Sequence, residues 1–329
     1  MGRIFLQATL RDPEFTGEKR EKLLEGLGRI GDVVPEPRPE VTAADAEGAV
    51  ASIAGGSLYT DEFYAAATDM RVVARWGVGF DKANVAGATR EGVLVTISPV
   101  HTDTVAEYAI AQWLATLKRV YTLHAMAHAG DFRLIKSYDV QRSALGIYGF
   151  GRIGQEVAKR AGTLLGPEGT LLVCDVRPDI AELAARYNAE VVATPAELFA
   201  RSDTVSLHVS GADPIVDYAV LSQMQPHASL INPSRANLVN DQDMARALDE
   251  GKLYYYVMDD PPKGAQEVHR GNQRVICTNH AAGITQESVE RLDATCVRQV
   301  EAALAGRRPD HILNPEALDH PRVRSWLQE

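Results

Sequence analysis

Two polar residues with complementary chemistry follow apolar runs in the second half of the sequence. Arg235 lies just beyond the run that ends at Ile231, and its planar guanidinium is suited to binding a carboxylate. His280 lies beyond the run 274–277, and an imidazole can give or take a proton near neutral pH. Hydride transfer to a carbonyl requires both functions, because the developing alkoxide must be stabilised and then protonated. An isolated pair of this kind is more often a surface arginine and a structural histidine. The neighbouring sequence must therefore decide between a catalytic and a structural role.

A glycine-rich turn lies in the middle of the chain, within the stretch 145–160. An apolar run, a Gly-x-Gly-x-x-Gly turn and an amphipathic segment follow one another there, which predicts a strand, a tight turn and a helix. Gly149 would permit the tight turn, Gly151 would let the backbone approach a pyrophosphate, and Gly154 would let the helix pack on the strand. The helix beginning near Arg152 would direct its unpaired N–H groups at the phosphates.

An acid ends the next predicted strand, 170–175. Asp175 lies 21 residues after Gly154, where a dinucleotide-binding fold places the carboxylate that accepts hydrogen bonds from the ribose. The alternative is a glycine-rich loop beside a solvated acid, and the order of strand, glycines, helix and acid disfavours it. Asp175 would repel a 2′-phosphate, which predicts NAD rather than NADP, although Arg177 would partly offset the repulsion.

Composition and charge exclude several kinds of partner. The net charge of −10 and the isoelectric point near 5.4 argue against nucleic acid, which requires a basic face. No apolar run reaches membrane-spanning length, and the start of the sequence does not resemble a signal peptide, so we expect a cytoplasmic protein without a membrane partner. The three cysteines, Cys174, Cys277 and Cys296, are widely spaced and predict neither a disulfide framework nor a metal cluster.

The alternation of apolar segments predicts two parallel α/β domains, as the length of 329 residues also suggests. In the first hundred residues we expect strands at 3–8, 50–54, 71–74 and 93–96, a proline-rich loop at 35–39, and a helix that Thr60 caps. A single long helix is predicted from 103 to about 128, either crossing between domains or subunits or packing on its own domain.

After the glycine turn the alternation resumes. Helix-start signals occur at Thr194, which precedes a proline, and at Asn240. Further strands are expected at 204–208, 229–231, 253–258 and 274–277. The last helix, from about 285 to 305, has one apolar face, is stopped by Gly306, and could return to the first domain.

Five stretches, taken in order, resemble the D-isomer-specific 2-hydroxyacid dehydrogenase family, which includes phosphoglycerate, glyoxylate and formate dehydrogenases. They are Gly77 to Asp81, Thr104 to Glu107, the glycine turn with Asp175, Asn232 to Arg235 with Asp259 downstream, and Asn279 to Gly283. The resemblance implies an α/β fold of two Rossmann-like or flavodoxin-like parallel-sheet domains. An NAD-binding domain, 100–283, would be inserted into a split substrate domain, 1–99 plus 284–329, with the active site in the cleft between them.

The resemblance also implies roles for the candidate substrate-site residues. Arg235 would bind the substrate carboxylate and carbonyl, and His280 would be the acid and base. The backbone amides of Val78 and Gly79 would hold the substrate carboxylate. Arg75 lies where some relatives meet a second anionic group, which would fit a phosphorylated or dicarboxylate substrate, and a surface or ion-paired Arg75 is an equal alternative.

The implied cofactor is NAD, and the implied partners are a small 2-hydroxy or 2-oxo acid and, because relatives are commonly dimers, a second copy of the chain. Asp259 would hold the nicotinamide carboxamide, and Arg152 and Ile153 would lie at the pyrophosphate. The full set of implied cofactor residues is Thr104, Gly149, Gly151, Arg152, Ile153, Gly154, Asp175, His208, Pro233, Ser234, Asp259 and Gly283.

One departure from the family pattern affects the histidine. The family places a glutamate 29 residues after the arginine to orient the histidine, and this chain has Gly264 there. Asp260, Gln266 or Glu267 would serve instead if the loop is remodelled, or nothing does. The main hypothesis is therefore an NAD-dependent oxidoreductase that interconverts a D-2-hydroxy acid and its 2-oxo acid. The alternative is a dehydrogenase-like NAD(H) sensor or corepressor without catalysis.

Overall fold

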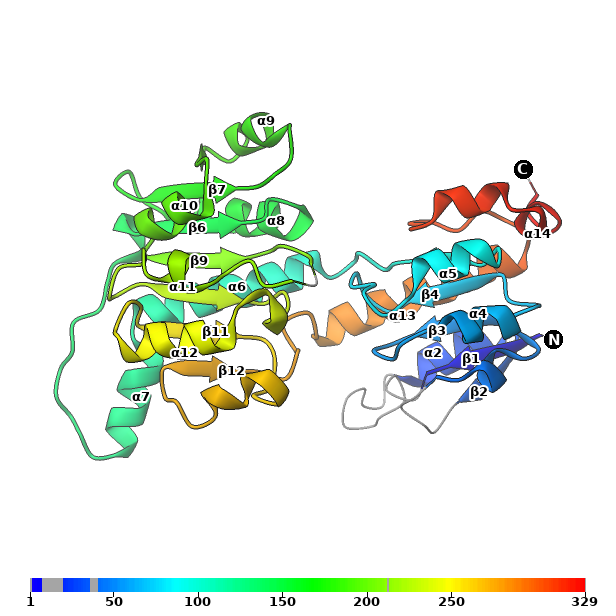
Figure 1. The fold of residues 1–329 in the computed structure, drawn as a ribbon, viewed down its shortest axis with the longest axis horizontal. Helices are drawn as coiled ribbons and strands as arrows, with labels where there is room; N and C mark the ends of the chain where they lie inside the picture. The colour runs from blue at the N-terminus through cyan, green and yellow to red at the C-terminus, as the bar shows by residue number, and fades with distance from the viewer. Residues whose placement is uncertain (1, 8–19, 36–40, 212, 329) are drawn as a thin grey trace. The chain divides into compact units, whose positions relative to one another are not determined.

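The computed structural model describes residues 2–7, 20–35, 41–211 and 213–328. The chain divides into two compact units, Met1–His101 with Ile284–Glu329, and Thr102–Gly283. Each unit is built on one parallel sheet (Figure 1). The fold is therefore α/β throughout, as the alternating apolar segments predict.

The first unit contains a five-stranded parallel sheet in the order β2-β1-β3-β4-β5. Its strands are β1 (Arg3–Leu6), β2 (Asp32–Pro35), β3 (Ala49–Ala54), β4 (Val72–Arg75) and β5 (Leu94–Thr96). One face packs against α2 (Arg20–Gly28) and α13 (Gln286–Leu304), and the other against α3 (Ala43–Ala46), α4 (Asp61–Ala66) and α5 (Val85–Arg90). Both faces are thus covered, as a parallel sheet requires.

Helix α13 brings the end of the chain back to this first sheet. Thr285 caps it by accepting a hydrogen bond from the Ser288 amide. Its apolar face, which includes Leu292 and Cys296, is buried in the same core as Ile4 of β1. The C-terminal segment therefore completes the core that the first hundred residues begin.

The second unit contains a seven-stranded parallel sheet in the order β12-β11-β10-β9-β6-β7-β8. Its strands are β6 (Ala144–Tyr148), β7 (Thr170–Cys174), β8 (Glu190–Val191), β9 (Thr204–Leu207), β10 (Ser229–Asn232), β11 (Tyr255–Met258) and β12 (Val275–Cys277). The strand order reverses between β6 and β9. In open α/β sheets, ligands bind outside the carboxyl ends of the strands at such a point.

Helices cover both faces of this sheet. One face packs against α6 (Thr102–Leu117), α8 (Arg152–Ala161) and α9 (Ile180–Ala185), and the other against α10 (Pro195–Arg201), α11 (Tyr218–Leu221) and α12 (Asp241–Asp249). The predicted caps are confirmed: the Thr194 side chain accepts from the Glu197 amide, and the Asn240 side chain accepts from the amides of Gln242 and Asp243.

The prediction of one long helix from 103 to 128 is wrong. Two helices, α6 and α7 (Val120–His128), are separated at Arg119, which has a left-handed φ of 55°. The Arg119 guanidinium carbon lies 3.3 Å from the centre of the Tyr254 ring, and the buried side chain also donates to the His227 carbonyl. This cation–π contact joins residues far apart in the sequence, so the local pattern, which contains no Gly or Pro here, does not reveal the break.

Two edge strands also escape the sequence prediction. Strand β2 occupies residues 32–35 and overlaps the expected proline-rich loop, 35–39, at residue 35. Residues 36–39 of that loop lie outside the described residues. Strand β8 has two residues, both exposed. Short strands and prolines are typical of sheet edges, where they limit pairing with other chains, and such segments carry a weak strand signal.

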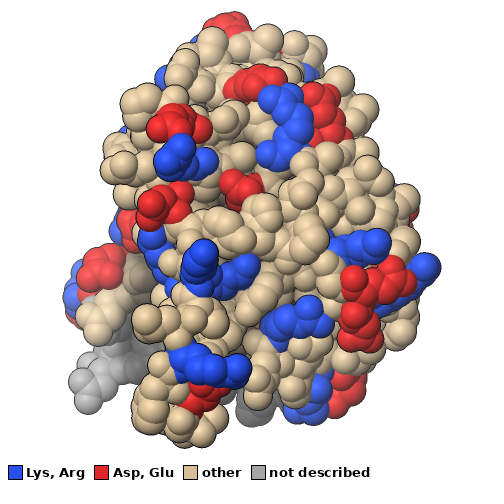
Figure 2. Space-filling view, turned by 90° about the vertical axis from the view of Figure 1, so that its left-hand side faces the viewer, with Lys and Arg blue, Asp and Glu red and all other residues tan. Residues whose placement is uncertain are grey.

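Cys174, Cys277 and Cys296 form no disulfide bond within the described residues. Among the residues that the structure describes, no helix is both long and apolar enough to cross a membrane. On the face drawn in Figure 2, acidic and basic side chains lie interspersed rather than in one broad basic area.

Candidate active site at the carboxyl ends of the second sheet

The glycine turn between β6 and α8 has the predicted strand–turn–helix form. Gly149 has a φ of 93°, and a Cβ atom there would lie 2.5 Å from the His208 carbonyl oxygen. A Cβ atom on Gly154 would lie 2.2 Å from the Gly149 carbonyl oxygen. Gly151, the N-cap of α8, differs, because a Cβ atom there would meet no protein atom within 4 Å. Two glycines are thus required by packing, and the third borders open space at a helix N-terminus, which suits a pyrophosphate.

Asp175 is fixed against this turn. Its carboxylate accepts hydrogen bonds from the Phe150 amide and, at 2.9 Å, from the Arg177 amide. The Arg177 guanidinium makes two contacts with the Asp179 carboxylate, of 2.6 and 2.9 Å, and these hydrogen bonds lower the pKa of Asp179. The cation next to Asp175 is therefore already paired with a second acid.

His208 follows β9 beside the same turn. Its Nε2 atom lies 2.8 Å from the Ser206 hydroxyl, and its Nδ1 atom is buried. Burial lowers the pKa of His208 to about 3, because the charged imidazolium would lose its hydration. His208 is therefore neutral at physiological pH and does not add positive charge to the site.

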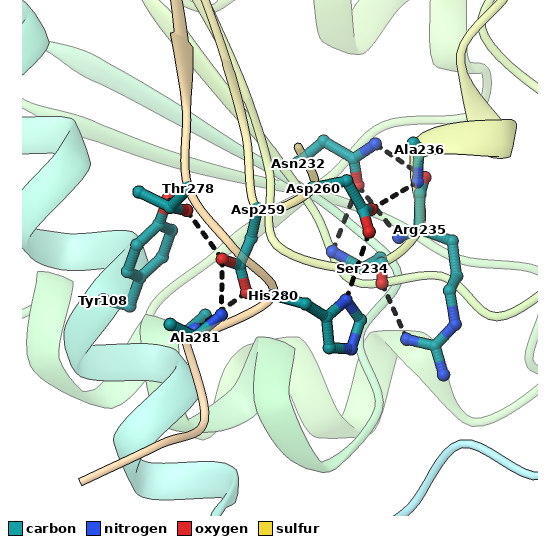
Figure 3. Close-up of polar contacts among 11 residues, drawn as sticks. Tyr108, Asn232, Ser234, Arg235, Ala236, Asp259, Asp260, Thr278, His280 and Ala281 are labelled. Carbon is teal, nitrogen blue, oxygen red and sulfur yellow. Dashed lines mark hydrogen bonds and ion pairs between the residues drawn. The ribbon is translucent and has the colours of Figure 1, made fainter. Parts of the chain in front are cut away.

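The loop after β10 orients Arg235. The buried Asn232 side chain accepts from the Ser234 and Arg235 amides and donates to the Arg235 carbonyl at 2.7 Å (Figure 3). The Ser234 hydroxyl donates to the Leu207 carbonyl, which ties the loop to the end of β9. The Arg235 guanidinium donates to the Ser234 carbonyl at 2.7 Å. The motif predicts no role for Asn232, and in the structure its side chain closes the turn that carries Arg235.

Asp259, after β11, is 3% exposed and holds the loop that carries His280. One carboxylate oxygen accepts from the Thr278 hydroxyl at 2.6 Å and the Ala281 amide at 2.8 Å, and the other accepts from the Ala282 amide at 2.7 Å. The family resemblance implies that Asp259 holds the cofactor carboxamide. In the structure its three contacts are all to the His280 loop.

Tyr108 of α6 extends this network. Its hydroxyl lies 2.8 Å from the Thr278 hydroxyl, and burial raises the pKa of Tyr108 to about 12, so the phenol stays protonated (Figure 3). Neither Tyr108 nor Thr278 was predicted as a site residue. The signal that was available is the spacing of Tyr108, which lies four residues after Thr104 and so shares a helix face with it.

His280 and Asp260 face each other. The His280 Nδ1 atom lies 3.3 Å from one Asp260 oxygen, and the Ala236 amide donates to the other at 2.9 Å. The His280 side chain is 55% exposed and that of Asp260 is 25% exposed. In Figure 3, the Arg235 and His280 side chains extend from neighbouring loops toward the same side of the sheet edge. The two residues with complementary chemistry are thus presented together.

The segment at the position of the family glutamate is turned toward α12. Gly264 begins a short 3-10 helix, η4 (Gly264–His269). Gln266 donates to one oxygen of Asp241 at 2.7 Å, and the buried His269 ring lies 3.0 Å from the other. Glu267 pairs instead with Arg270. Neither Gln266 nor Glu267 therefore contacts His280.

In the first unit, Arg75 supports the loop that follows β4. Its guanidinium donates to the carbonyls of Gly79 at 2.7 Å, Trp76 at 2.7 Å and Ala54 at 3.0 Å. Within the described residues, the amides of Val78 and Gly79 donate to no protein acceptor. Arg75 thus shapes a loop that offers two adjacent amides, an arrangement that can bind an anion.

The remaining predicted residues lie at element ends of the second unit. Arg152 and Ile153 begin α8, Thr104 is buried in the first turn of α6, Pro233 is in the Arg235 loop, and Gly283 is the last residue of the unit. Arg235, Asp259 and His280, which follow β10, β11 and β12, thus lie beyond the carboxyl ends of the strands of the second sheet.

Comparisons with known proteins show the family to which the chain is similar. Residues 110–282 match the family model described as D-isomer specific 2-hydroxyacid dehydrogenase, NAD binding domain. The chain is 31% identical over 283 residues to a glyoxylate reductase of Korarchaeum cryptofilum, covering 80% of this chain and 82% of that protein. It is 26% identical over 304 residues to a D-3-phosphoglycerate dehydrogenase of Methanocaldococcus jannaschii, covering 89% of this chain and 57% of that protein.

A solved structure with the same fold is an NADPH-dependent glyoxylate/hydroxypyruvate reductase from Sinorhizobium meliloti. The TM-score is 0.81 at 22% identity, covering 96% of this chain and 98% of that one. At this identity the match establishes the fold.

Proposed function

Because this chain belongs to the D-isomer specific 2-hydroxyacid dehydrogenase family, we propose that it interconverts a small D-2-hydroxy acid and its 2-oxo acid with NAD. The observation that carries the proposal is the presentation of Arg235 and His280 together at the edge of the second sheet. A carboxylate-binding fork beside a proton donor is what reduction of a 2-oxo acid requires.

The proposed roles follow from the contacts of each side chain. The Arg235 guanidinium, oriented by the Ser234 carbonyl, would bind the substrate carboxylate and carbonyl oxygen and stabilise the developing alkoxide. The protonated His280 would donate to that alkoxide during reduction, and the neutral ring would accept the hydroxyl proton during oxidation. When bound, the nicotinamide ring would supply the hydride for reduction and accept it in oxidation.

The open space at Gly151 and the N-terminus of α8 fits the pyrophosphate of a dinucleotide. We propose that Asp175 binds the ribose hydroxyls. The pairing of Arg177 with Asp179 leaves two acids and one cation there, which favours NAD over NADP. The other residues that would line the cofactor are those inferred from the sequence: Thr104, Gly149, Arg152, Ile153, Gly154, His208, Pro233, Ser234, Asp259 and Gly283.

For the substrate, we propose that the Val78 and Gly79 amides bind the carboxylate. Arg75 already donates to three carbonyls of its own unit. Because these contacts already occupy Arg75, we expect a small substrate rather than a substrate with a second anionic group that Arg75 would have to bind.

We also propose a homodimer. Helix α7 has no buried residue, although most of its side chains are apolar, and the following segment exposes Phe132 by 82% and Leu134 by 98%. A second copy covering this surface would remove it from water. Light scattering should give twice the chain mass, and Leu134→Asp should shift it toward the monomer; a monomeric wild type would refute the proposal.

The experiment that tests the function is consumption of NADH with a panel of 2-oxo acids, including glyoxylate, hydroxypyruvate, pyruvate and a dicarboxylate. We expect turnover with at least one small member. The second candidate, a non-catalytic NAD(H) sensor, is favoured by the glycine at position 264 in place of the family glutamate. Binding of NADH, measured by fluorescence, without turnover of any acid would establish that alternative.

A further inference from the structure

We propose that Asp260 is the positioning residue of His280, in place of the glutamate that the family has at the position of Gly264. The proposal rests on the proposed function, because it assigns a residue to the same histidine. It concerns how the ring is held and which of its nitrogens carries the proton.

The Asp260 carboxylate connects both loops of the site. One oxygen accepts from the Ala236 amide at 2.9 Å, directly after Arg235, and the other lies 3.3 Å from His280 Nδ1 (Figure 3). The Ala236 amide can only donate, so it holds one carboxylate oxygen of Asp260 in place. The second oxygen is thereby aimed at the imidazole.

The backbone on either side of the pair is fixed as well. Asp259, the neighbour of Asp260, accepts from the Ala281 and Ala282 amides, which follow His280. His280 has a φ of 58°, which non-glycine residues rarely adopt and which surrounding contacts must maintain. Two successive acids therefore hold the histidine, one through the backbone that follows it and one through its ring.

Glu267, the other carboxylate that could have contacted His280, lies in η4 and is paired with another residue. Gln266 and His269 anchor η4 to Asp241 on α12, and Glu267 pairs with Arg270. Within the described part of the chain, no carboxylate other than Asp260 lies within ion-pairing distance of His280. Before Glu267 could contact His280 in place of Asp260, Glu267 would have to leave Arg270 and η4 would have to leave α12.

The contact selects one protonation pattern of the ring. A carboxylate only accepts, so His280 Nδ1 carries a proton that it donates to Asp260, and in the neutral ring Nε2 is the basic nitrogen. Asp260 and the cationic Arg235, which comes from the neighbouring loop, are the charged groups of the site beside the ring. The effect of Asp260 that the geometry supports is on the orientation and tautomer of the ring.

The substitution Asp260→Asn separates these effects. The Ala236 amide still requires an acceptor, so the asparagine oxygen turns toward it and the NH₂ group faces His280 Nδ1. Nδ1 must then accept, which places the proton of the neutral ring on Nε2 and removes the base. We expect kcat/KM for hydroxy-acid oxidation to fall by roughly 10- to 100-fold. Reduction at low pH should change little, because the protonated ring still carries a donor proton on Nε2.

Two further variants are the controls. Asp260→Glu returns a carboxylate and should recover part of the lost oxidation rate. Glu267→Gln removes a carboxylate from η4 and should leave both pH profiles unchanged. An equal loss of kcat/KM for oxidation and for reduction in Asp260→Asn would reduce Asp260 to a structural role. A shifted profile in Glu267→Gln would assign the role to Glu267.

A readout independent of turnover distinguishes failure of this proposal from failure of the proposed function. Two-bond ¹H–¹⁵N spectra of protein labelled at histidine report the tautomer, and a His280→Phe variant assigns the signal. We expect the neutral wild-type ring to be protonated at Nδ1 and the Asp260→Asn ring at Nε2. A wild-type ring protonated at Nε2 would overturn the proposal, whether or not the protein reduces any 2-oxo acid.

Discussion

A Cβ atom on Gly154 would lie 2.2 Å from the carbonyl oxygen of Gly149, so the first turn of α8 rests directly on the backbone of the glycine turn. Real Cβ atoms do not approach backbone oxygen this closely, and α8 would have to move to admit an alanine. The same relationship does not hold at Gly151, where the space is open. The two glycines therefore allow packing and cofactor binding to be tested separately.

Gly154→Ala should destabilise the protein by about 1–3 kcal/mol through overpacking. Gly151→Ala should lower stability by no more than about 1 kcal/mol, since the side chain meets no protein atom at this N-cap. It should nevertheless weaken NADH binding at least roughly tenfold if the pyrophosphate occupies that space. Urea unfolding and NADH fluorescence measure the two effects, and unchanged NADH affinity in Gly151→Ala would place the phosphates elsewhere.

Cofactor preference should depend on the two acids near the turn. The wild type should use NADH with a higher kcat/KM than NADPH, because Asp175 opposes a 2′-phosphate and Asp179 occupies Arg177. Asp175→Ala combined with Asp179→Ala should release Arg177 and shift the ratio toward NADPH by about 1–2 kcal/mol, roughly 5- to 30-fold.

Glu182→Ala is the matched control, because Glu182 is an exposed acid of α9 that pairs with Arg186. It should leave the ratio of kcat/KM values unchanged. Equal use of NADH and NADPH by the wild type would contradict the assignment of Asp175.

Arg235→Ala should cost far more activity than removal of a surface arginine. Loss of a charge-assisted bidentate partner costs ~2–4 kcal/mol at a buried site, which is roughly 30- to 1000-fold in kcat/KM. Arg235→Lys keeps the charge without the planar fork and should recover little. Arg142→Ala, which removes an exposed arginine paired with Glu168, is the control. An Arg235→Ala enzyme within a few-fold of the wild type would remove Arg235 from the site.

The sequence predicts the elements whose signals are local. The glycine turn and the caps at Thr194 and Asn240 depend on a few consecutive residues, and each occurs where expected. The break at Arg119 depends on Tyr254, and the position of η4 depends on Asp241, both distant in the sequence. Such long-range contacts decide which of Asp260, Gln266 and Glu267 reaches His280. The motif alone therefore does not show which of these three residues contacts His280.

The final prediction concerns His208 and the pH dependence of stability. Burial lowers its pKa to about 3, whereas an unfolded histidine titrates near 6.5. Between these values the unfolded chain binds a proton that the folded chain does not bind. The stabilising contribution is therefore complete above about pH 6.5 and is lost as the pH falls toward 3.

The variant His208→Gln cannot take up this proton and retains an amide that can reach Ser206. The free energy of unfolding, measured in urea from pH 5 to 8 without cofactor, should fall more steeply with decreasing pH in the wild type. The difference in slope should approach 1.4 kcal/mol per pH unit, the limit for one proton. His311→Gln, at an exposed position of the first unit, should keep the wild-type slope. If His208→Gln also keeps it, folded His208 binds its proton over the same pH range as the unfolded chain, and burial does not keep the ring neutral.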